Sequence, residues 1–282
     1  MLKLLPWFTG ENRANPLVMS DCAAPGCSGR KPLLGLWWKD EGVTAQGRWY
    51  CSAECCREAV QRSVAAMLAA SRRQPALNRM PLGLLLVSQG RLREEQVREA
   101  LEAQRASGEG RIGSWLRRSG AITAEELTRA LGQQSNCPVL ALEKVAPLAD
   151  RLPLHWCRRQ RVLPVYWSQA RNTLWLAFGS PVRYAALRAV EQILECRCDP
   201  CMVDEEALGR ALENAGRLGD EPETVFRALP ASEIAAITVS YAAQLQAREV
   251  RWVECGGDIW VRFLGRERRS DIFFEGPGEG GA

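Results

Sequence analysis

The feature that most constrains the fold of this chain is an internal repeat with a period of thirty residues. When residues 81–104 are placed on residues 111–134, glycines, apolar residues and a glutamine coincide. The coincident pairs are Gly83 and Gly113, Leu86 and Leu116, Gly90 and Gly120, Glu95 and Glu125, Ala100 and Ala130, Leu101 and Leu131, and Gln104 and Gln134. A period of this length indicates that one supersecondary unit is folded twice.

Each copy predicts a short apolar helix, a break at its second glycine and a longer amphipathic helix. Val97 and Leu101 are four residues apart in the first long helix, and the second copy repeats this spacing. Thr123-x-x-Glu126 predicts a capping box at the start of the second long helix. The residues alone therefore predict a small bundle of two helix-turn-helix units, packed as a pseudo-symmetric pair.

The repeat resembles the MshEN domain, which precedes the motor core of type II secretion and type IV pilus ATPases. The signature of that family is Arg-Leu-Gly, a hydrophobic turn, Gly, and then Leu, Leu and Gln along a helix. The resemblance covers roughly residues 78–215, and it implies that cyclic di-GMP binds between the two copies. The implied ligand-binding residues are Leu82, Gly83, Leu86, Val97, Leu101 and Gln104 in the first copy, and Arg111, Ile112, Gly113, Leu116, Leu127, Leu131 and Gln134 in the second.

The chemistry of such a site is coherent. One Arg fork can meet the O6 and N7 acceptors of guanine, a Gly lets the backbone approach closely, and helix N-terminal amides suit a phosphate. The first copy departs from the signature because Pro81 stands where the second copy has Arg111, and Arg79 is a candidate substitute. The alternative is a copy that keeps the fold and has lost the ligand, which would leave a protein-interaction module that binds no nucleotide.

Four of the eleven cysteines form two close pairs near the N-terminus, Cys22-x4-Cys27 and Cys51-x3-Cys55. Four thiolates can surround one Zn²⁺ ion and leave no open coordination position, so the zinc is expected to be structural. The segment from Trp49 to Cys55 resembles the second knuckle of treble-clef zinc modules, although the first pair has four intervening residues instead of two. The alternative is a set of reduced cysteines packed in a core.

The surroundings of these cysteines predict a hairpin followed by a helix. Its strands are expected at Leu33–Trp38 and Arg48–Cys51, with a polar turn at Lys39–Gly47 between them. The helix is expected at Glu54–Ser71, with Ser52 as its N-cap.

From Leu152 onwards the pattern changes to that of an α/β segment. Strands are predicted at Val162–Trp167, Thr173–Phe178 and Arg197–Val203, and helices at Pro181–Leu194 and Asp204–Glu213.

Cys196, Cys198 and Cys201 fall on or beside the third of these strands. They could form a metal cluster or a redox pair, but alternating cysteines on a strand are more typical of packing. His155 is the only histidine, which leaves no other residue for the base of a Ser-His-Asp mechanism.

Residues 230–247 predict a helix, followed by strands at Val250–Glu254, Ile259–Leu264 and Asp271–Glu275. This piece resembles the domain that lies just before the motor core of the same ATPases. No G-x4-G-K-[S/T] phosphate loop occurs in the chain, so we expect no ATP hydrolysis and no enzymatic activity.

The charge and hydropathy exclude two further classes of partner. The net charge is only +4 and the basic residues are scattered among acids, so no nucleic-acid-binding stripe is predicted. The richest basic cluster, Arg158–Arg161, is typical of a solvated helix face. No run of about 18 apolar residues occurs, which argues against membrane insertion. An odd number of cysteines does not suit a disulfide framework and indicates a cytoplasmic protein.

These patterns predict an α+β multidomain protein. Its parts are an N-terminal segment at 1–20, a zinc module at 21–72, a tandem helix-turn-helix repeat at 78–146, a small α/β subdomain at 147–215, a short C-terminal α/β piece at 228–275 and a disordered tail at 276–282. The leading hypothesis is a non-catalytic, cytoplasmic cyclic di-GMP-binding regulatory or adaptor protein that acts on secretion or pilus machinery. A metal-dependent or redox enzyme is the weakest alternative, and the oligomeric state is not indicated.

Overall fold

The structure of the protein is a computed structural model that describes residues 21–29, 42–71, 79–142, 148, 151–215, 224–227, 229–266 and 268–276. The expected N-terminal segment, the expected strand at 33–38 and residues 277–282 of the expected tail lie outside these ranges. The described residues form helices and two sheets, which confirms the α+β fold class. They divide into two compact units, one of residues 1–64, 230–251 and 263–269, and one of residues 65–229, 252–262 and 270–282.

The first unit contains a tight hairpin of β1 (Val43–Ala45) and β2 (Arg48–Tyr50). Its two-residue loop has positive φ at both Gln46 and Gly47, as a type I′ turn requires. The predicted polar turn at 39–47 is therefore wrong in part, because the strand paired with β2 comes from within it. β1 also pairs in parallel with β7 (Glu249–Cys255), where Thr44 is opposite Glu249.

The helices α1 (Ala53–Ser71) and α9 (Ala231–Gln244) lie where the sequence predicts helices. The predicted cap of α1 is confirmed, because the Ser52 hydroxyl accepts a hydrogen bond from the Cys55 amide at 3.3 Å. Helix α9 buries an apolar face, and its Tyr241 ring stacks on Phe263 with the ring centroids 6.2 Å apart.

The larger sheet has the strand order β2-β1-β7-β8-β9-β6, with β8 at Asp258–Leu264 and β9 at Arg269–Glu275. The last strand, β6 (Thr224–Arg227), runs parallel to β9 and is absent from the sequence prediction. Its four residues are too few to establish an alternating pattern in the sequence.

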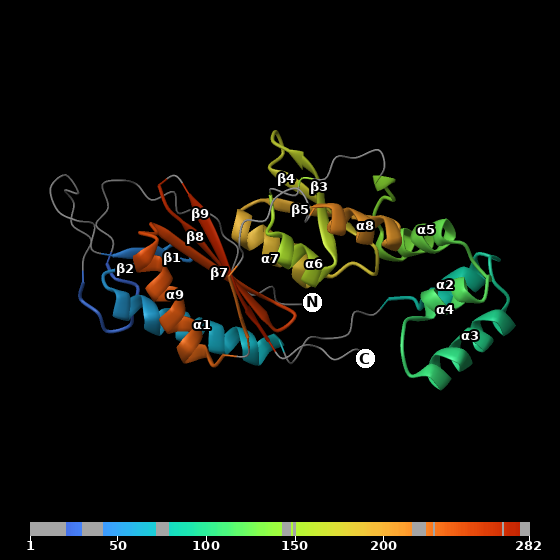
Figure 1. Ribbon diagram of the computed structural model, residues 1–282, viewed down its shortest axis with the longest axis horizontal. Helices are drawn as coiled ribbons and strands as arrows, with labels where there is room; N and C mark the ends of the chain where they lie inside the picture. Colours follow the sequence, from blue (N-terminus) through green and yellow to red (C-terminus); the bar gives the residue numbers. More distant parts are fainter. Residues whose placement is uncertain are drawn as a thin grey trace, which may run out of the picture. The chain divides into compact units, whose positions relative to one another are not determined.

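The second unit contains the helical repeat, which is labelled at the right of Figure 1. The two short helices are α2 (Leu82–Ser88) and α4 (Ile112–Arg118), and the two long helices are α3 (Glu94–Ser107) and α5 (Ala124–Ser135). Gly90 and Gly120 have φ of 66° and 72° at the turns between short and long helix, a conformation that favours glycine. The predicted breaks and the capping box of Thr123 and Glu126 are confirmed.

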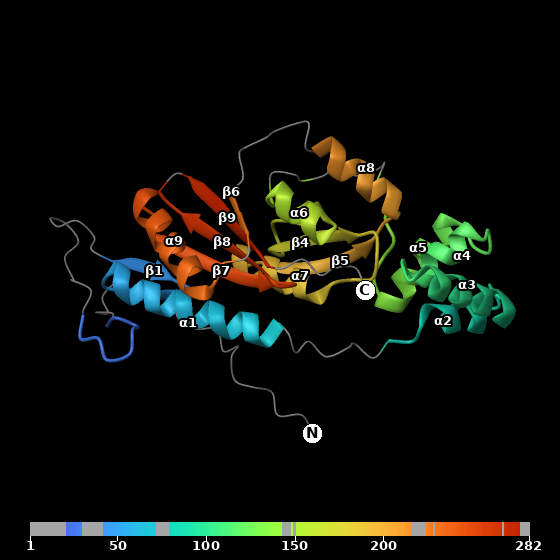
Figure 2. The ribbon, with the colours of Figure 1, turned by 60° about the horizontal axis from the view of Figure 1, so that its bottom comes forward.

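The same unit contains a three-stranded sheet of order β3-β4-β5, with strands at Val162–Ser168, Thr173–Phe178 and Arg197–Met202. β3 and β4 are antiparallel, whereas β4 and β5 are parallel and are joined through the crossover helix α7 (Tyr184–Leu194). Helix α8 (Glu205–Ala215) follows β5. Figure 2 shows α6 (Leu154–Gln160) and α7 beside these strands. The strands and helices predicted here are confirmed.

The outer edge of β5 has its amide groups occupied. Residues 197 and 203 donate toward β4, so the N–H groups of residues 198 and 202 and the nitrogen of Pro200 face outward. Cys198 N donates to the Glu191 carboxylate at 3.1 Å, and Met202 N donates to the Pro138 carbonyl at 2.8 Å. Pro200 has no N–H to donate, which explains how a proline can occupy a strand interior here.

Helix α6 packs against strand β8 within the second unit. The Trp156 and Trp260 rings lie 5.2 Å apart, and Arg159 forms a bidentate ion pair with Asp258 at 2.8 and 3.0 Å. Gln160 is buried. The prediction that residues 158–161 form a solvated helix face therefore holds for the three arginines, which are exposed, and is wrong for Gln160 alone, whose amide donates to the Cys255 carbonyl at 3.5 Å.

A second ion pair lies inside this sheet. Arg262, which is 3% exposed, donates twice to the Asp271 carboxylate at 2.8 and 3.0 Å. The Trp260 indole N–H donates to the same carboxylate at 2.7 Å, and the Arg262 guanidinium lies over the Trp260 ring. Loss of one partner would leave the other charge buried without a counter-ion, which strongly destabilises a fold.

Candidate functional site

In the repeat, the short helix of each copy packs against the long helix of the other copy. The short helix α2 lies against the long helix α5 of the other copy, α4 lies against α3, and the two short helices meet each other. The Gln104 amide donates to the carbonyl of Gly110 at 2.7 Å, and the Gln134 amide donates to the carbonyl of Met80 at 2.7 Å. Met80 and Gly110 are equivalent positions. Each glutamine predicted for the site thus holds the residue just before the other copy's signature, and the pair is approximately two-fold symmetric.

The signature glycines bring the short helices onto the long ones. A Cβ on Gly83 would lie 2.7 Å from Val97 Cγ1, and a Cβ on Gly113 would lie 2.8 Å from Leu127 Cδ1. Each signature glycine therefore lets its short helix approach the long helix of the same copy.

The predicted apolar residues differ in how accessible they are. Leu86 and Leu116 are fully buried, and Leu82 and Leu131 are buried as well. Leu101, the equivalent of Leu131, is 36% exposed. The asymmetry arises because α5 packs on β5, whereas α3 buries only Ala100 among its described side chains. The remaining predicted residues, Val97, Ile112 and Leu127, are half-buried.

Arg111 presents its side chain to solvent at the N-terminus of α4. Its backbone carbonyl accepts the amides of Ser114 and Trp115. Its guanidinium is exposed and makes no ion pair or hydrogen bond with any residue that the structure describes. The side chain is thus available to a ligand.

The equivalent position in the first copy is Pro81, and Arg79 does not replace the missing guanidinium. Arg79 donates to the Val182 carbonyl at 3.2 Å, and its guanidinium lies 5.1 Å from the centroid of the Tyr184 ring. Tyr184 is the first residue of α7, and Val182 lies two residues before it. Arg79 therefore ties the repeat to the α/β subdomain.

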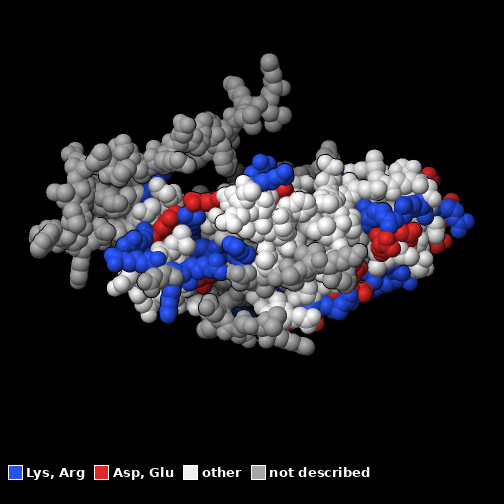
Figure 3. Space-filling model, turned by 90° about the horizontal axis from the view of Figure 1, so that it is seen from above, with Lys and Arg blue, Asp and Glu red and all other residues white. Residues whose placement is uncertain are grey.

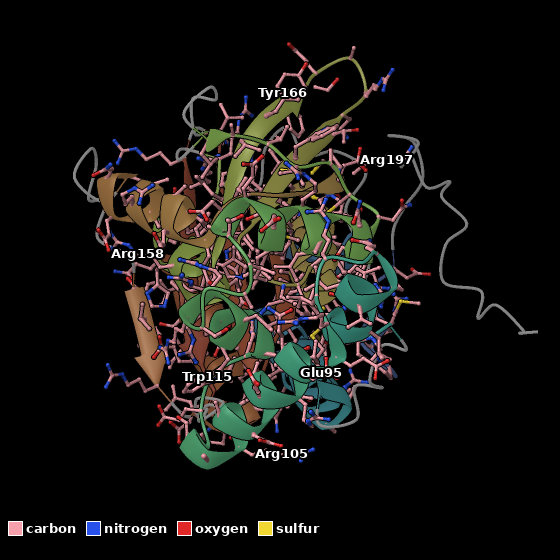
Figure 4. All side chains as sticks on the ribbon, turned by 90° about the vertical axis from the view of Figure 1, so that its right-hand side faces the viewer. Glu95, Arg105, Trp115, Arg158, Tyr166 and Arg197 are labelled. Atoms are coloured by element: carbon pink, nitrogen blue, oxygen red, sulfur yellow. The ribbon has the colours of Figure 1, made fainter. Side chains whose placement is uncertain are left out.

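Sequence reasoning missed Trp115, which lies one helical turn after Arg111 and is labelled among the repeat helices in Figure 4. Its indole N–H donates to the Glu109 carbonyl at 3.0 Å, and the Arg118 guanidinium lies 5.0 Å from its ring centroid. An aromatic residue four positions after the signature Arg was the available signal, but the first copy has Leu85 there.

A surface pocket of about 320 Å³ lies beside α4 and is lined by Ser114, Arg117, Arg118, Glu205 and Glu206. Arg117 pairs with Glu206 across it, and this hydrogen bond raises the pKa of Arg117. In Figure 3, blue and red side chains likewise lie next to each other at the right-hand end of the face shown. The pocket lining therefore contains two arginines and two glutamates, whose charges offset each other.

The four cysteines of the N-terminal pairs come together as predicted. Their sulfur atoms lie within 4.8 Å of one another. The Cys27–Cys51, Cys27–Cys55 and Cys51–Cys55 sulfur separations are 3.5, 3.8 and 3.9 Å. Four thiolates bound to one zinc at about 2.3 Å would be about 3.8 Å apart. The spacing fits a tetrahedral zinc site, and this is the only such group of ligands within the described ranges.

The surroundings favour the thiolate form at Cys22, whereas side-chain hydrogen bonds with Cys27 and Cys22 raise the pKa of Cys51 to about 12. Burial raises the pKa of the Cys22 thiol, but backbone hydrogen bonds with Cys51 and Ala24 outweigh it and lower the pKa to about 7. The Gly29 amide donates to the Cys27 sulfur at 3.4 Å. Cys51 and Cys55 flank the first residues of α1, where the helix dipole stabilises negative charge.

The other cysteines serve packing. Cys56 lies 1% exposed in the core, and burial raises its pKa to about 11. Cys196, Cys198 and Cys201 are buried, and burial raises the pKa of Cys201 to about 12. A hydrogen bond with Cys196 raises the pKa of Cys198 as well. Two of these three thiols are thus held protonated, which does not suit a nucleophile or a redox pair.

Comparisons with known proteins match the sheet that follows the helical repeat. The model of the MshEN domain family matches residues 135–222. The solved structure of MshE with cdg is 30% identical in sequence; the match covers 49% of this chain and 99% of that one, with a TM-score of 0.43. The N-terminal domain of XpsE is 14% identical, over 53% of this chain and 94% of that one, with a TM-score of 0.35. A search of curated proteins gave no match.

Among the helices that the structure describes, none has the length and apolar character needed to cross a membrane. Residues 135–222 of this chain match the MshEN domain family.

Proposed function

We propose that this chain is a non-catalytic regulatory or adaptor protein that binds cyclic di-GMP at its helical repeat. The observation that carries the proposal is the free guanidinium of Arg111, presented at the start of α4 in an approximately two-fold repeat. A two-fold ligand suits a two-fold protein site. The related MshE structure was solved with cdg, an abbreviation of cyclic di-GMP.

The proposed contacts follow from what remains accessible. Arg111 would meet O6 and N7 of one guanine. The amide nitrogens of Gln104 and Gln134 donate to backbone carbonyls, so their side-chain oxygens would accept the N–H groups of the bases. Leu101, at 36% exposure, offers apolar contact. The other residues implied by the family signature would shape the site from beneath; they are Leu82, Gly83, Leu86, Val97, Ile112, Gly113, Leu116, Leu127 and Leu131.

The proposal includes one structural Zn²⁺ ion held by Cys22, Cys27, Cys51 and Cys55. Four thiolate ligands leave no coordination position for a substrate, so the ion would supply folding energy only. In a segment with few buried apolar residues, that contribution would be about 10 kcal/mol or more.

We further propose that the chain acts in the cytoplasm on a protein of a secretion or pilus machine. None of the eleven cysteines, all of which the structure describes, forms a disulfide, which suits a reducing compartment. Within its 282 residues the chain has no phosphate loop. Binding of the nucleotide would stiffen the two copies and alter how the flanking parts meet their partner.

Calorimetric titration of the zinc-loaded chain with cyclic di-GMP tests the nucleotide site. We expect the wild type to bind, and Arg111→Ala to bind about ten- to a hundredfold more weakly, the range for one bidentate contact to guanine. Arg129→Ala is the matched control, because Arg129 is an exposed arginine of the same repeat that pairs only with Glu125 among described residues. An equal loss in both variants would mean that general charge, not base recognition, binds the ligand.

A folded, zinc-loaded wild type that does not bind would refute this function and favour the second candidate. That candidate is a protein-interaction module without a nucleotide, and the specific observation in its favour is Pro81 at the signature position of the first copy. Elemental analysis tests the metal separately. One zinc per chain agrees with the N-terminal cluster alone, whereas two would point to a further site.

A further inference from the structure

The two copies present different chemistry at equivalent surface positions, although their backbones match. In the second copy, the positions around the signature Arg are glycine, a cation, a hydroxyl and an indole. In the first copy the same positions are apolar. The pairs are Met80 and Gly110, Pro81 and Arg111, Leu84 and Ser114, and Leu85 and Trp115.

The second copy holds its arginine at a defined place. The carbonyl of Gly110 is fixed by the Gln104 amide, and Gly110 itself has φ of 83°. The Arg111 carbonyl accepts the first amides of α4. The backbone on both sides of Arg111 is thus anchored while its guanidinium is free, which is the preorganised state that favours a specific contact.

The first copy has no equivalent donor. Pro81 has neither a side-chain donor nor an N–H, and Arg79 is bound to the Val182 carbonyl and the Tyr184 ring. The surface beside Pro81 is formed by Met80 and Leu84, which are 55% and 62% exposed. This half of the site offers apolar contact to a base but no fork of donors.

The difference matters because guanine and adenine differ where an arginine reads them. Guanine presents two acceptors, O6 and N7, to the five N–H donors of a guanidinium, whereas adenine presents one acceptor and an amino donor. An arginine therefore prefers guanine. An apolar surface discriminates weakly between bases of the same size and shape.

We infer that the site reads one guanine, through Arg111, and accepts either purine in the half formed by Met80, Pro81 and Leu84. The ligand class is thus wider than cyclic di-GMP and includes the mixed cyclic dinucleotide of GMP and AMP. This inference rests on the proposed function and specifies its ligand preference.

The test is calorimetric titration of the zinc-loaded full chain with three ligands: cyclic di-GMP, 3′,3′-cyclic GMP–AMP and cyclic di-AMP. We expect the mixed ligand to bind about twofold more weakly than cyclic di-GMP, because only one of its two orientations places guanine on Arg111. We expect cyclic di-AMP to bind about ten- to a hundredfold more weakly than cyclic di-GMP.

A gain-of-specificity variant keeps the test independent of loss of folding. Pro81 lies exposed before α2 with φ of −55°, a backbone conformation that arginine also adopts. Pro81→Arg should create a preference of about ten- to a hundredfold for cyclic di-GMP over the mixed ligand. Ser88→Arg is the matched control, since it adds the same charge at an exposed position of the same helix, outside these three residues, and should leave the ratio of the two affinities unchanged.

The outcomes separate this inference from the function on which it rests. A tenfold or greater preference of the wild type for cyclic di-GMP over the mixed ligand overturns the inference and leaves the proposed function standing. Equal binding of cyclic di-AMP also overturns it, because Arg111 would then not read the base. If none of the three ligands binds, the proposed function fails together with the inference.

Discussion

Replacing Asp271 with alanine tests the buried ion pair of the larger sheet. Arg262 is 3% exposed and donates two hydrogen bonds to the Asp271 carboxylate. Asp271→Ala leaves that charge buried without its counter-ion, which typically costs about 3–5 kcal/mol. At about 2–4 °C per kcal/mol for a chain of this size class, the melting temperature should fall by about 6–20 °C.

Two measurements check the size and the place of this effect. Scanning calorimetry gives the shift in melting temperature, and hydrogen–deuterium exchange gives the local opening of β8 and β9. A local loss of about 3 kcal/mol should accelerate exchange in these strands by about a hundredfold. Glu125→Gln is the control, because the exposed Arg129–Glu125 pair on α5 should contribute less than about 1 kcal/mol.

A double variant separates loss of charge pairing from general damage to the sheet. Arg262→Met with Asp271→Leu removes both charges and leaves only the Trp260 N–H without its acceptor, at about 1–3 kcal/mol. The double variant should therefore be more stable than Asp271→Ala alone. The reasoning is refuted if the single variant is within about 1 kcal/mol of the wild type, or if the double variant is the less stable of the two.

Two further variants test the metal cluster and the helix packing. Cys51→Ser should abolish stoichiometric zinc in elemental analysis and make the first unit sensitive to limited proteolysis, whereas Cys56→Ala, beside the cluster, should retain the metal; zinc retained by Cys51→Ser would contradict the assignment. Gly83→Ala should cost about 1–3 kcal/mol, because its Cβ would lie 2.7 Å from the stiff Val97 side chain. Gly209→Ala, where no other atom lies within 4 Å of the added Cβ, should instead stabilise α8 by up to about 1 kcal/mol, and calorimetry that ranks the two the other way would refute the packing argument.

The repeat could be predicted from the sequence because its signals are local. The turn glycines Gly90 and Gly120, the capping box and the helical spacing all act within a few residues. The difference in burial between Leu101 and Leu131 could not be predicted. It depends on which long helix packs on β5, and the two copies carry the same apolar spacing.

The other errors share one cause, which is pairing between distant segments. β1 resembles part of a turn in the sequence because three residues carry little pattern, and its pairing of Thr44 with Glu249 spans most of the chain. Local sequence cannot show that the exposed Arg159 pairs with Asp258, because the two residues are 99 positions apart. The role of Arg79 is likewise set by Val182, 103 residues away. The cysteine cluster is predictable because metal geometry itself restricts the spacing of its ligands.

The occupied edge of β5 has a consequence for the chain before it is fully folded. A strand with open amides can recruit a strand from another molecule, which is how sheets grow into aggregates. On β5 the Glu191 carboxylate, the ring of Pro200 and the Pro138 carbonyl leave no outward amide to start such growth. If the three-stranded sheet forms before the rest of the chain has folded, this edge therefore does not pair with a strand of another molecule.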